Sequence, residues 1–371
     1  MGPRVEVAVS RVRASGTPAE RRGILLVNPG GPGGSGLLYA GTKRAELPES
    51  VRRAYDVVGF DPRGVGRTTP VTCGPMGGLF DSPGSDPVPA GAGAERTYLA
   101  SLRALADDCA THAGRLLPYL STRQTAYDME AIRAALGEPR TSFLGVSYGS
   151  YLGAAYTARF PHRVGRMVLD SVVGPGSWYD FDVLQSRALL RQRDIFFAWT
   201  AARAGRFGLG GTPAAVRDSY LRVRRELAAR PVAGFGPAEF DRAVYRALGR
   251  TERWAGLADG LRGQLTDGDP DGLRPAGAFD SADSRNYEAA NRVALLVASA
   301  HDPVTPIEGA RRLQRLLPGS RLVALDDDYS HGVFASRGDA CVDDTVAACL
   351  VRGEVPSANV RCTGPGLPTA R

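Results

Sequence analysis

Residues 141–149 read TSFLGVSYG, and this stretch decides the fold that the sequence predicts. Its first six residues form a mostly apolar run of the kind found in buried strands. The run breaks at a turn in which Gly145 and Gly149 flank Ser147, and a predicted helix follows as far as Phe160. A buried strand that turns directly into a helix is the repeating unit of a sheet with helices packed against it.

Outward from this stretch, the same alternation of strand and helix covers most of the chain. Strands are predicted at 5–12, 23–27, 55–60, 166–170, 293–298 and 321–325, and helices at 96–110, 125–136, 306–317 and 342–352. The helix at 125–136 carries a capping box, Thr125 with Asp128, and ends at Gly137. The predicted fold class is α/β, with a mostly parallel sheet flanked by helices on both faces.

The alternation stops between about 178 and 280. This segment contains helical stretches at 184–202, 214–229 and 237–248, with glycine and proline breaks and no clear strand. We therefore predict a helical cap domain inserted into the α/β core. The core would comprise 1–174 and 286–371, and the cap 175–285.

Composition and charge exclude several classes of protein. The chain has 371 residues, a net charge of +7 and a mean hydropathy of −0.18. Its basic residues are scattered arginines with a single lysine, Lys43, so we expect no nucleic-acid partner. No run of 18 apolar residues exists, so we expect no membrane insertion. The five cysteines form no C-x-x-C pair, so we predict no metal site. We also predict a monomer without a cofactor.

Ser147 stands at the centre of the pattern G-x-S-x-G, between a strand and a helix. This is the setting that a nucleophile elbow requires, because the glycines permit a tight turn that lifts the serine hydroxyl out of the sheet. The helix that follows favours negative charge near its first residues. A Gly/Ser turn without catalytic meaning is the alternative interpretation.

A serine nucleophile needs a base, and the chain has four histidines. His331 follows the predicted strand 321–325 and suits the chain order Ser, Asp, His. His112 and His162 lie in polar segments and are expected at the surface. His301 either lines the pocket or has a structural role.

The acid that orients the histidine is expected at the end of a strand. Asp302 directly follows the strand 293–298, at the edge where open α/β sheets collect their ligands. Asp170 ends another strand and is the competing candidate. We favour Asp302, so the predicted catalytic residues are Ser147, Asp302 and His331.

An oxyanion formed at the substrate carbonyl needs two backbone N–H donors. One is predicted at Tyr148, the residue after the nucleophile. The other is expected from residues 28–36, NPGGPGGSG, where Gly30, Gly31 and Gly33 are candidates and Gly31 is our choice. A phosphate cradle is the alternative interpretation of this loop, but neither common glycine-rich phosphate motif fits it.

These motifs together resemble one branch of the α/β-hydrolases. The matching stretches are LVNPGGPGGSG at 26–36, GFDPRGVG at 59–66, GVSYGSYLG at 145–153, DPVTP at 302–306, SHGV at 330–333 and the tail from Cys341 to Cys362. They resemble the tripeptidyl aminopeptidase-like enzymes, which are related to the proline iminopeptidases. The resemblance implies an α/β-hydrolase fold, with Ser147, Asp302 and His331 as a catalytic triad, and Gly31 with Tyr148 as oxyanion donors.

The resemblance also has implications for the cysteines and the location. It implies the disulfides Cys341–Cys362 and Cys73–Cys109, with Cys349 unpaired. Members of this family are mostly secreted bacterial exopeptidases, so we expect an extracellular enzyme although no leader follows Met1. A cytoplasmic location is the alternative.

The chain departs from the family pattern in its cap. The insertion is shorter than usual, and residues 278–283, AFDSAD, have Ser281 where the family has cysteine. The family's cap carries carboxylates that bind a substrate amine. The candidates for this role are Asp180, Asp182, Asp194, Glu239 and Asp241, and solvated helix faces are the alternative interpretation.

The sequence therefore predicts a serine hydrolase that works through an acyl-enzyme. The substrate is a small peptide or a small-molecule acyl compound. The favoured activity is that of an exopeptidase acting at a free N-terminus, and the alternative is an esterase, lactonase or amide hydrolase acting on a small natural product. A binding protein on an inactive scaffold is a further alternative. Epoxide hydrolases and haloalkane dehalogenases of this fold would have aspartate in place of Ser147.

Overall fold

The computed structural model describes residues 4–74, 86–274, 294–317 and 319–369. The chain divides into two compact units. The first, here called the sheet unit, comprises Met1–Pro70, Pro118–Ala188 and Ala278–Gly366. The second, the helical unit, comprises Val71–Leu117, Leu189–Gly277 and Leu367–Arg371. The predicted boundaries at 175 and 285 stay a prediction, and residue 285 lies outside the described residues.

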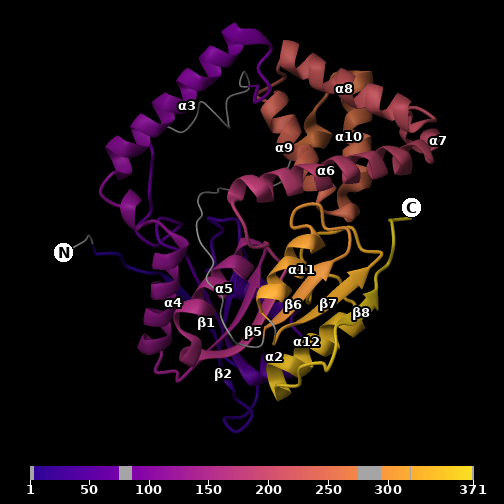
Figure 1. The fold of residues 1–371 in the computed structure, drawn as a ribbon. Helices are drawn as coiled ribbons and strands as arrows, with labels where there is room; N and C mark the ends of the chain where they lie inside the picture. Colours follow the sequence, from indigo (N-terminus) through magenta and orange to yellow (C-terminus); the bar gives the residue numbers. More distant parts are fainter. Residues whose placement is uncertain (1–3, 75–85, 275–293, 318, 370–371) are drawn as a thin grey trace. The chain divides into compact units, whose positions relative to one another are not determined.

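The sheet unit is built on an eight-stranded sheet with the order β1-β3-β2-β4-β5-β6-β7-β8 (Figure 1). The strands are β1 (Val9–Val12), β2 (Gly23–Asn28), β3 (Tyr55–Phe60), β4 (Thr141–Val146), β5 (Val164–Asp170), β6 (Leu295–Ser299), β7 (Arg321–Asp326) and β8 (Val360–Thr363). Only β1 is antiparallel to its neighbour within this sheet. The predicted α/β class with a mostly parallel sheet is confirmed.

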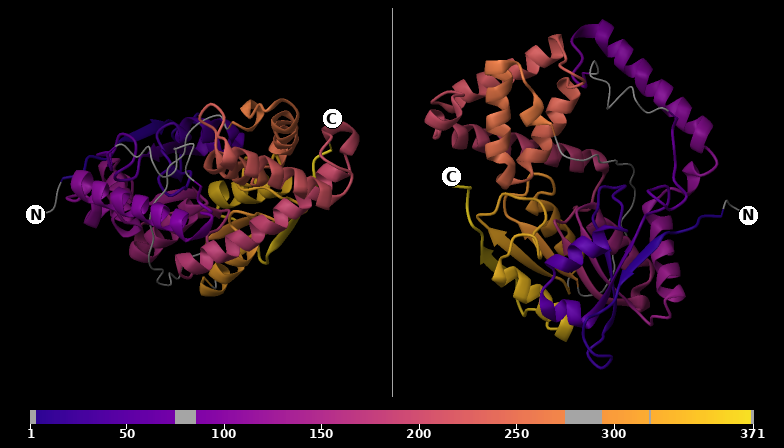
Figure 2. Two further views of the ribbon diagram at one scale, coloured as in Figure 1. Left: turned by 90° about the horizontal axis from the view of Figure 1, so that it is seen from above. Right: turned by 180° about the vertical axis from the view of Figure 1, so that it is seen from behind.

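Helices cover both faces of the sheet (Figure 1 and Figure 2). One face packs against α4 (Thr122–Ala135), α5 (Tyr148–Arg159) and α11 (Ile307–Leu316), and the other against α1 (Tyr39–Glu46), α2 (Glu49–Ala54) and α12 (Ala340–Arg352). Alternate residues of each strand enter opposite cores, as Phe143 and Leu144 of β4 do. Burial on both faces explains why these strands are continuous apolar runs.

The start of α4 differs from the sequence prediction. The helix begins at Thr122, and its N-cap is Ser121, whose Oγ accepts a hydrogen bond from Gln124 N at 3.3 Å. The capping box at Thr125 and Asp128 is therefore wrong. Asp128 is instead held by Arg63 through two hydrogen bonds of 2.6 and 2.8 Å, a tertiary contact that competes with capping.

The helical unit has its own core. Its helices are α3 (Gly91–Ala113), the greater part of α6 (Trp178–Ala201), α7 (Ala204–Phe207), α8 (Pro213–Ala229), α9 (Pro237–Leu248) and α10 (Trp254–Asp267). Large aromatic side chains from these helices, among them Phe196, Phe240 and Trp254, form one buried cluster. The three helices predicted in this region are present, and α10 was not predicted.

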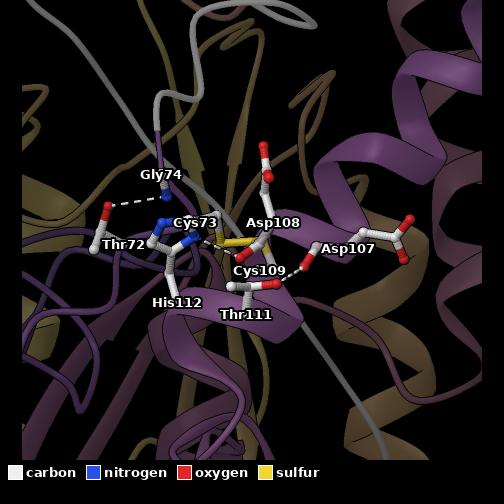
Figure 3. The surroundings of a disulfide bond; sticks show 8 residues. All are labelled: Thr72, Cys73, Gly74, Asp107, Asp108, Cys109, Thr111 and His112. Atoms are coloured by element: carbon white, nitrogen blue, oxygen red, sulfur yellow. Dashed lines mark hydrogen bonds between the residues drawn. A yellow bond between two sulfur atoms is a disulfide. The ribbon is translucent and has the colours of Figure 1, made fainter.

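One disulfide of the helical unit ties α3 to the segment before it. Cys73 is bonded to Cys109, and the neighbouring His112 lies with Nδ1 at 2.9 Å from Asp108 O (Figure 3). The other disulfide, Cys341–Cys362, joins α12 to β8 in the sheet unit. Both pairs implied by the family resemblance are present, and Cys349 is a free, buried cysteine whose thiol pKa is raised by burial.

Candidate active site

The turn between β4 and α5 holds Ser147 in a strained backbone conformation. Its φ of 59° and ψ of −126° lie outside the usual regions for a residue with a side chain, at a cost of roughly 1–3 kcal/mol. Surrounding main-chain bonds maintain it: Ser147 N donates to Asp170 O at 2.9 Å, and Ser147 O accepts from Ser150 N at 2.8 Å. Strain of this kind, held in place by neighbours, is typical of a nucleophile elbow.

The glycines on either side of Ser147 are required by close backbone contacts. A Cβ atom on Gly145 would lie 2.2 Å from Gly149 O. A Cβ atom on Gly149 would lie 2.8 Å from Asn28 O, at the end of β2. The turn therefore admits no larger residue at either position, as the sequence pattern predicts.

His331 and Asp302 are hydrogen-bonded to each other. Nδ1 of His331 lies 2.9 Å from Oδ2 of Asp302, whose side chain is completely buried, while 19% of the His331 side chain is exposed. A carboxylate at this distance fixes the ring orientation and favours the tautomer with its proton on Nδ1. Nε2 is then available for proton exchange with a nucleophile.

Thr305 completes the surroundings of Asp302 and was not singled out from the sequence. Oδ1 of Asp302 accepts from Val304 N at 2.8 Å and from Thr305 N at 2.9 Å. The Thr305 hydroxyl donates to Oδ2 at 2.7 Å, and its oxygen lies 3.2 Å from His331 Nδ1. The signal in the sequence is local, because an aspartate commonly bonds the amides two and three residues ahead.

The three predicted catalytic residues come from one edge of the sheet. Ser147 follows β4, Asp302 follows β6 and His331 follows β7, and these strands run parallel within the order β4-β5-β6-β7. Their carboxyl ends therefore meet at the same edge, where ligand sites of open α/β sheets form.

The glycine-rich loop after β2 passes close to the elbow. A Cβ atom on Gly30 would lie 3.0 Å from Tyr148 N and 2.9 Å from Ser147 Cβ. Gly30 N donates to Asn28 Oδ1 at 3.0 Å, so this amide is used within the loop. Of the three candidates for the second oxyanion donor, Gly30 is therefore the weakest. Gly30, Gly31 and Gly33 all have positive φ angles, 90°, 116° and 95°, which favour glycine.

Asp61, at the end of β3, anchors this loop. Its Oδ1 accepts from Ser35 Oγ at 2.6 Å and from Gly36 N at 3.0 Å, and its Oδ2 accepts from Arg67 N at 2.8 Å. The side chain is buried, so these charge-assisted bonds are strong. The sequence motif at 59–66 thus supports the glycine-rich loop, a role that sequence reasoning did not assign.

Comparison with known proteins identifies the family of the chain. A model of the alpha/beta hydrolase fold matches residues 23–336. The chain belongs to the alpha/beta hydrolase family. A tripeptidyl aminopeptidase from Streptomyces lividans is 33% identical to the hydrolase over 440 residues, covering 99% of this chain and 82% of the relative. The serine protease Hip1 of Mycobacterium tuberculosis (strain ATCC 25618 / H37Rv) is 27% identical, covering 96% and 83%.

The family branch implied by the sequence is thereby confirmed. Among solved structures, the proline iminopeptidase of Mycobacterium smegmatis aligns with 94% of the hydrolase and 95% of its own chain, at 16% identity and a TM-score of 0.46. The protein is a serine hydrolase of the tripeptidyl aminopeptidase-like branch. In the part of the hydrolase that the structure describes, no helix has the length and apolar character needed to cross a membrane.

The competing acid, Asp170, has different partners from Asp302. Its carboxylate accepts hydrogen bonds from the backbone N–H groups of Val333 and Phe334, at 3.0 and 2.9 Å from Oδ2. Burial raises the pKa of Asp170, and the positive charge of Lys43 and these backbone donors offset only part of that rise. The hydrolase thus brings Asp302 to the His331 ring and Asp170 to the main chain after it.

The structure places the other three histidines at the surface. His112 and His162 are exposed, as expected. His301 is also exposed, and its ring stacks on that of Tyr329 with 4.4 Å between centroids. Its stacking favours the structural role over lining the pocket.

The carboxylates considered as amine ligands have internal partners in most cases. Asp180 accepts from Ser177 Oγ at 2.7 Å, and Glu239 accepts from Gly236 N at 2.9 Å. Asp194 pairs with Arg193 at 3.0 Å and Asp241 with Arg224 at 2.8 Å. Asp182 is the fifth candidate. Ser281, where the family has cysteine, lies outside the described residues.

One acidic and thiol cluster of the described residues has the spacing of a metal site. Its members are Asp339, Cys341 and Cys362. Because both sulfur atoms are joined in a disulfide, the cluster offers no thiolate ligand.

Proposed function

We propose that the hydrolase is an exopeptidase that releases residues or short peptides from a free peptide N-terminus. The observation that carries the catalytic assignment is the 2.9 Å contact between His331 Nδ1 and Asp302 Oδ2. Both residues follow strands whose carboxyl ends lie at the same edge of the sheet as the strained Ser147. The peptide preference is supported by the full-length similarity to the Streptomyces tripeptidyl aminopeptidase.

Catalysis proceeds in two half-reactions. Ser147 Oγ attacks the peptide carbonyl while His331 Nε2 accepts its proton, and Asp302 stabilises the imidazolium that forms. The N–H groups of Tyr148 and Gly31 donate to the oxyanion. His331 returns the proton to the leaving amine, which departs and leaves an acyl-enzyme. Water, activated by His331, then releases the acid and regenerates Ser147.

A fluorophosphonate probe tests the nucleophile. We expect the wild-type protein to be labelled on Ser147 and the Ser147→Ala variant to lose labelling altogether. Thr157→Ala is the matched control, because that hydroxyl lies on the same helix and donates within it, to Gly153 O at 2.8 Å. Unlabelled wild type, or labelling that survives in Ser147→Ala, would overturn the assignment.

A substrate panel tests the specificity. Aminoacyl-, prolyl- and tripeptidyl-anilides with free N-termini should be cleaved, and the same compounds with acetylated N-termini should not. Cleavage restricted to blocked peptides or to p-nitrophenyl esters would contradict the exopeptidase proposal and favour the esterase alternative. Because acyl transfer is common to both, the nucleophile assignment would survive that result.

We propose further that the enzyme works outside the cell as a monomer and without a nucleic-acid partner. The support for the location is the pair of disulfides, which persist in oxidising compartments. Peptide mapping of protein from the culture medium should find both pairs oxidised, and light scattering should give the mass of one chain. Recovery of a reduced protein from the cytoplasm alone would contradict the location.

A further inference from the structure

Two buried charged side chains contact the loop that carries His331, and the mechanism above uses neither of them. Asp170 is fully buried and Lys43 is 1% exposed. Lys43 is also the only lysine of the chain, in which basic positions are otherwise arginine. Burying a charge is unfavourable unless it is paired and hydrogen-bonded, so both groups need a specific set of partners.

The side chain of Asp170 holds the main chain directly after His331. Its Oδ2 accepts from Val333 N at 3.0 Å and from Phe334 N at 2.9 Å. The adjacent Ser171 hydroxyl accepts from Gly332 N at 2.7 Å and lies 3.3 Å from Asp170 Oδ1, to which it donates. Three consecutive amides after the histidine are therefore bound at the end of β5.

The backbone of Asp170 holds the nucleophile turn at the same time. Its carbonyl oxygen accepts the hydrogen bond from Ser147 N at 2.9 Å. One residue of β5 thus contacts both the turn that presents Ser147 and the loop that presents His331. Asp170 therefore links these two elements directly.

Lys43 secures the same loop from α1. Its Nζ donates to Phe334 O at 2.6 Å and to Ser336 Oγ at 2.9 Å, with Glu46 Oε2 at 3.1 Å as a further partner. Asp170 thus binds the N–H of Phe334 and Lys43 binds its carbonyl. The two charges hold opposite sides of one residue.

We infer that Asp170 and Lys43 are positioning residues that fix Val333 and Phe334 and so hold His331 in register with Ser147. This inference rests on the proposed catalytic role of Ser147 and His331. A misplacement of about 1 Å between reacting groups can cost a hundredfold in rate, so small movements of this loop matter. A merely structural role would lower stability without a specific effect on His331.

Conservative variants test the inference. Asp170→Asn keeps the shape but removes the charge that strengthens its hydrogen bonds, and Lys43→Met keeps the length without the ammonium group. We expect each to reduce the rate of fluorophosphonate labelling at Ser147 about tenfold, and to reduce kcat for p-nitrophenyl acetate with little change in KM. Because both act on Phe334, the double variant should lose less than the product of the two effects.

Asp343→Asn is the matched control. Asp343 accepts from Ala335 N at 2.8 Å, so this variant weakens the same kind of bond one residue further along the same loop. It should lose stability like the other two variants while retaining the labelling rate within about twofold. An equal fall in all three variants would overturn the inference and leave only a structural role.

The NMR signals of the histidine rings give a measurement that does not depend on activity. The chain has four histidines, and the His331→Gln spectrum identifies the signal of His331. Asp170→Asn and Lys43→Met should shift or broaden that signal and leave the other three unchanged. Unchanged His331 signals in folded variants would contradict the inference. If Asp170→Asn does not fold, Lys43→Met and Ser171→Ala decide the question.

The two proposals fail in different ways. Absence of labelling in the wild-type protein would refute the proposed function, whereas the ring resonances would still report on the His331 loop. Normal wild-type labelling with unchanged variants would refute only the positioning role.

Discussion

The sheet unit and the helical unit bury different kinds of side chain. Among the described residues, every buried charged side chain belongs to the sheet unit: Lys43, Asp56, Asp61, Asp128, Arg133, Glu138, Asp170, Asp302 and Asp328. The core of the helical unit is built from aromatic and aliphatic groups such as Phe240 and Trp254. Stability in the helical unit thus depends on packing, whereas the sheet unit also buries charges, among them Asp170 and Asp302 at or just beyond the carboxyl ends of β5 and β6.

The contrast is clearest at three buried carboxylates of the sheet unit. Asp61, Asp170 and Asp302 lie at or just beyond the ends of parallel strands, and each holds a loop through several backbone amides. A hydrophobic residue of similar size would be easier to bury at each position. We therefore expect these carboxylates to fix loop geometry more than to add stability.

The largest expected effect is on catalysis through Asp302. Asp302→Asn should lower kcat by about 10⁴-fold, because an amide at this position favours the wrong histidine tautomer. The free energy of unfolding should fall far less than activity does. Steady-state kinetics with the preferred anilide, together with urea unfolding, measure the two quantities.

Asp328→Asn serves as the comparison for that experiment. Asp328 is another buried aspartate before His331, but its Oδ1 accepts from Ser330 N and not from the histidine ring. Activity lost to the same extent in both variants would show that burial of a carboxylate, and not its bond to His331, is what matters.

The next effect concerns packing in the helical unit. Phe240 is fully buried, and Phe240→Ala should reduce the free energy of unfolding by about 3–5 kcal/mol. The folded variant should keep its rate of fluorophosphonate labelling, because the residues proposed for catalysis all belong to the sheet unit. Denaturant titration followed by fluorescence provides the measurement.

Leu190→Ala is the control for this change. Leu190 belongs to the same unit but is 50% exposed, so its removal should cost less than about 0.5 kcal/mol. Similar losses for the two variants would mean that the aromatic cluster does not form the core of the unit.

The disulfides allow a direct comparison of the units. Cys73–Cys109 lies in the helical unit with a sequence separation of 36, and Cys341–Cys362 lies in the sheet unit with a separation of 21. Replacing either pair by alanine should reduce the free energy of unfolding by about 3 kcal/mol, because each disulfide restricts the conformations of the unfolded chain. Only the replacement of Cys341 and Cys362 acts on the sheet unit. Calorimetry of the two variants measures the stability lost with each pair. A loss of stability in only one of the two variants would contradict the expectation that both disulfides contribute about equally.

The smallest effect is expected at an exposed charge of the sheet unit. Hydrogen bonds from Arg53, and then from the backbone and side chain of Thr17, lower the pKa of Glu20 from 4.5 to about 2. A lowered carboxyl pKa contributes stability above the unfolded value, and this contribution is lost as pH falls from 4.5 toward 2. Glu20→Gln should therefore lower the melting temperature slightly at neutral pH and not at all near pH 2.

Arg53→Gln should reproduce that pH trend, since it removes the hydrogen-bond partner that lowers the pKa of Glu20 most. Thermal melts of both variants between pH 2 and pH 7 provide the comparison. A stability difference that persists undiminished at pH 2 would show that the contact acts by packing and not by charge.

Apolar runs and strand ends made much of the fold and the candidate site predictable. The runs at 23–27, 55–60 and 141–146 correspond to strands buried on both faces, where alternation gives way to continuous hydrophobicity. The edge strand β8 was missed because only Cys362 among its four residues is buried. Short strands at a sheet edge leave little pattern to detect.

The surroundings of the proposed catalytic residues were less accessible to sequence reasoning. Asp302 and His331 were paired by strand order, but Asp170 was left as a competing acid because its partners are backbone amides far along the chain. Lys43 and Phe334 are 291 positions apart, so nothing local marks their hydrogen bond. Hydrogen bonds of this kind follow from the folded topology alone.

Lys43, the only lysine of the sequence, can serve as a chemical probe of local unfolding. Its ammonium group is covered by Phe334, Ser336 and Glu46, so amine-reactive reagents meet no accessible lysine on the folded chain. Acylation of Lys43 then proceeds only when α1 separates from the His331 loop. The rate of that modification, followed by mass spectrometry, therefore measures local opening between α1 and the loop after His331.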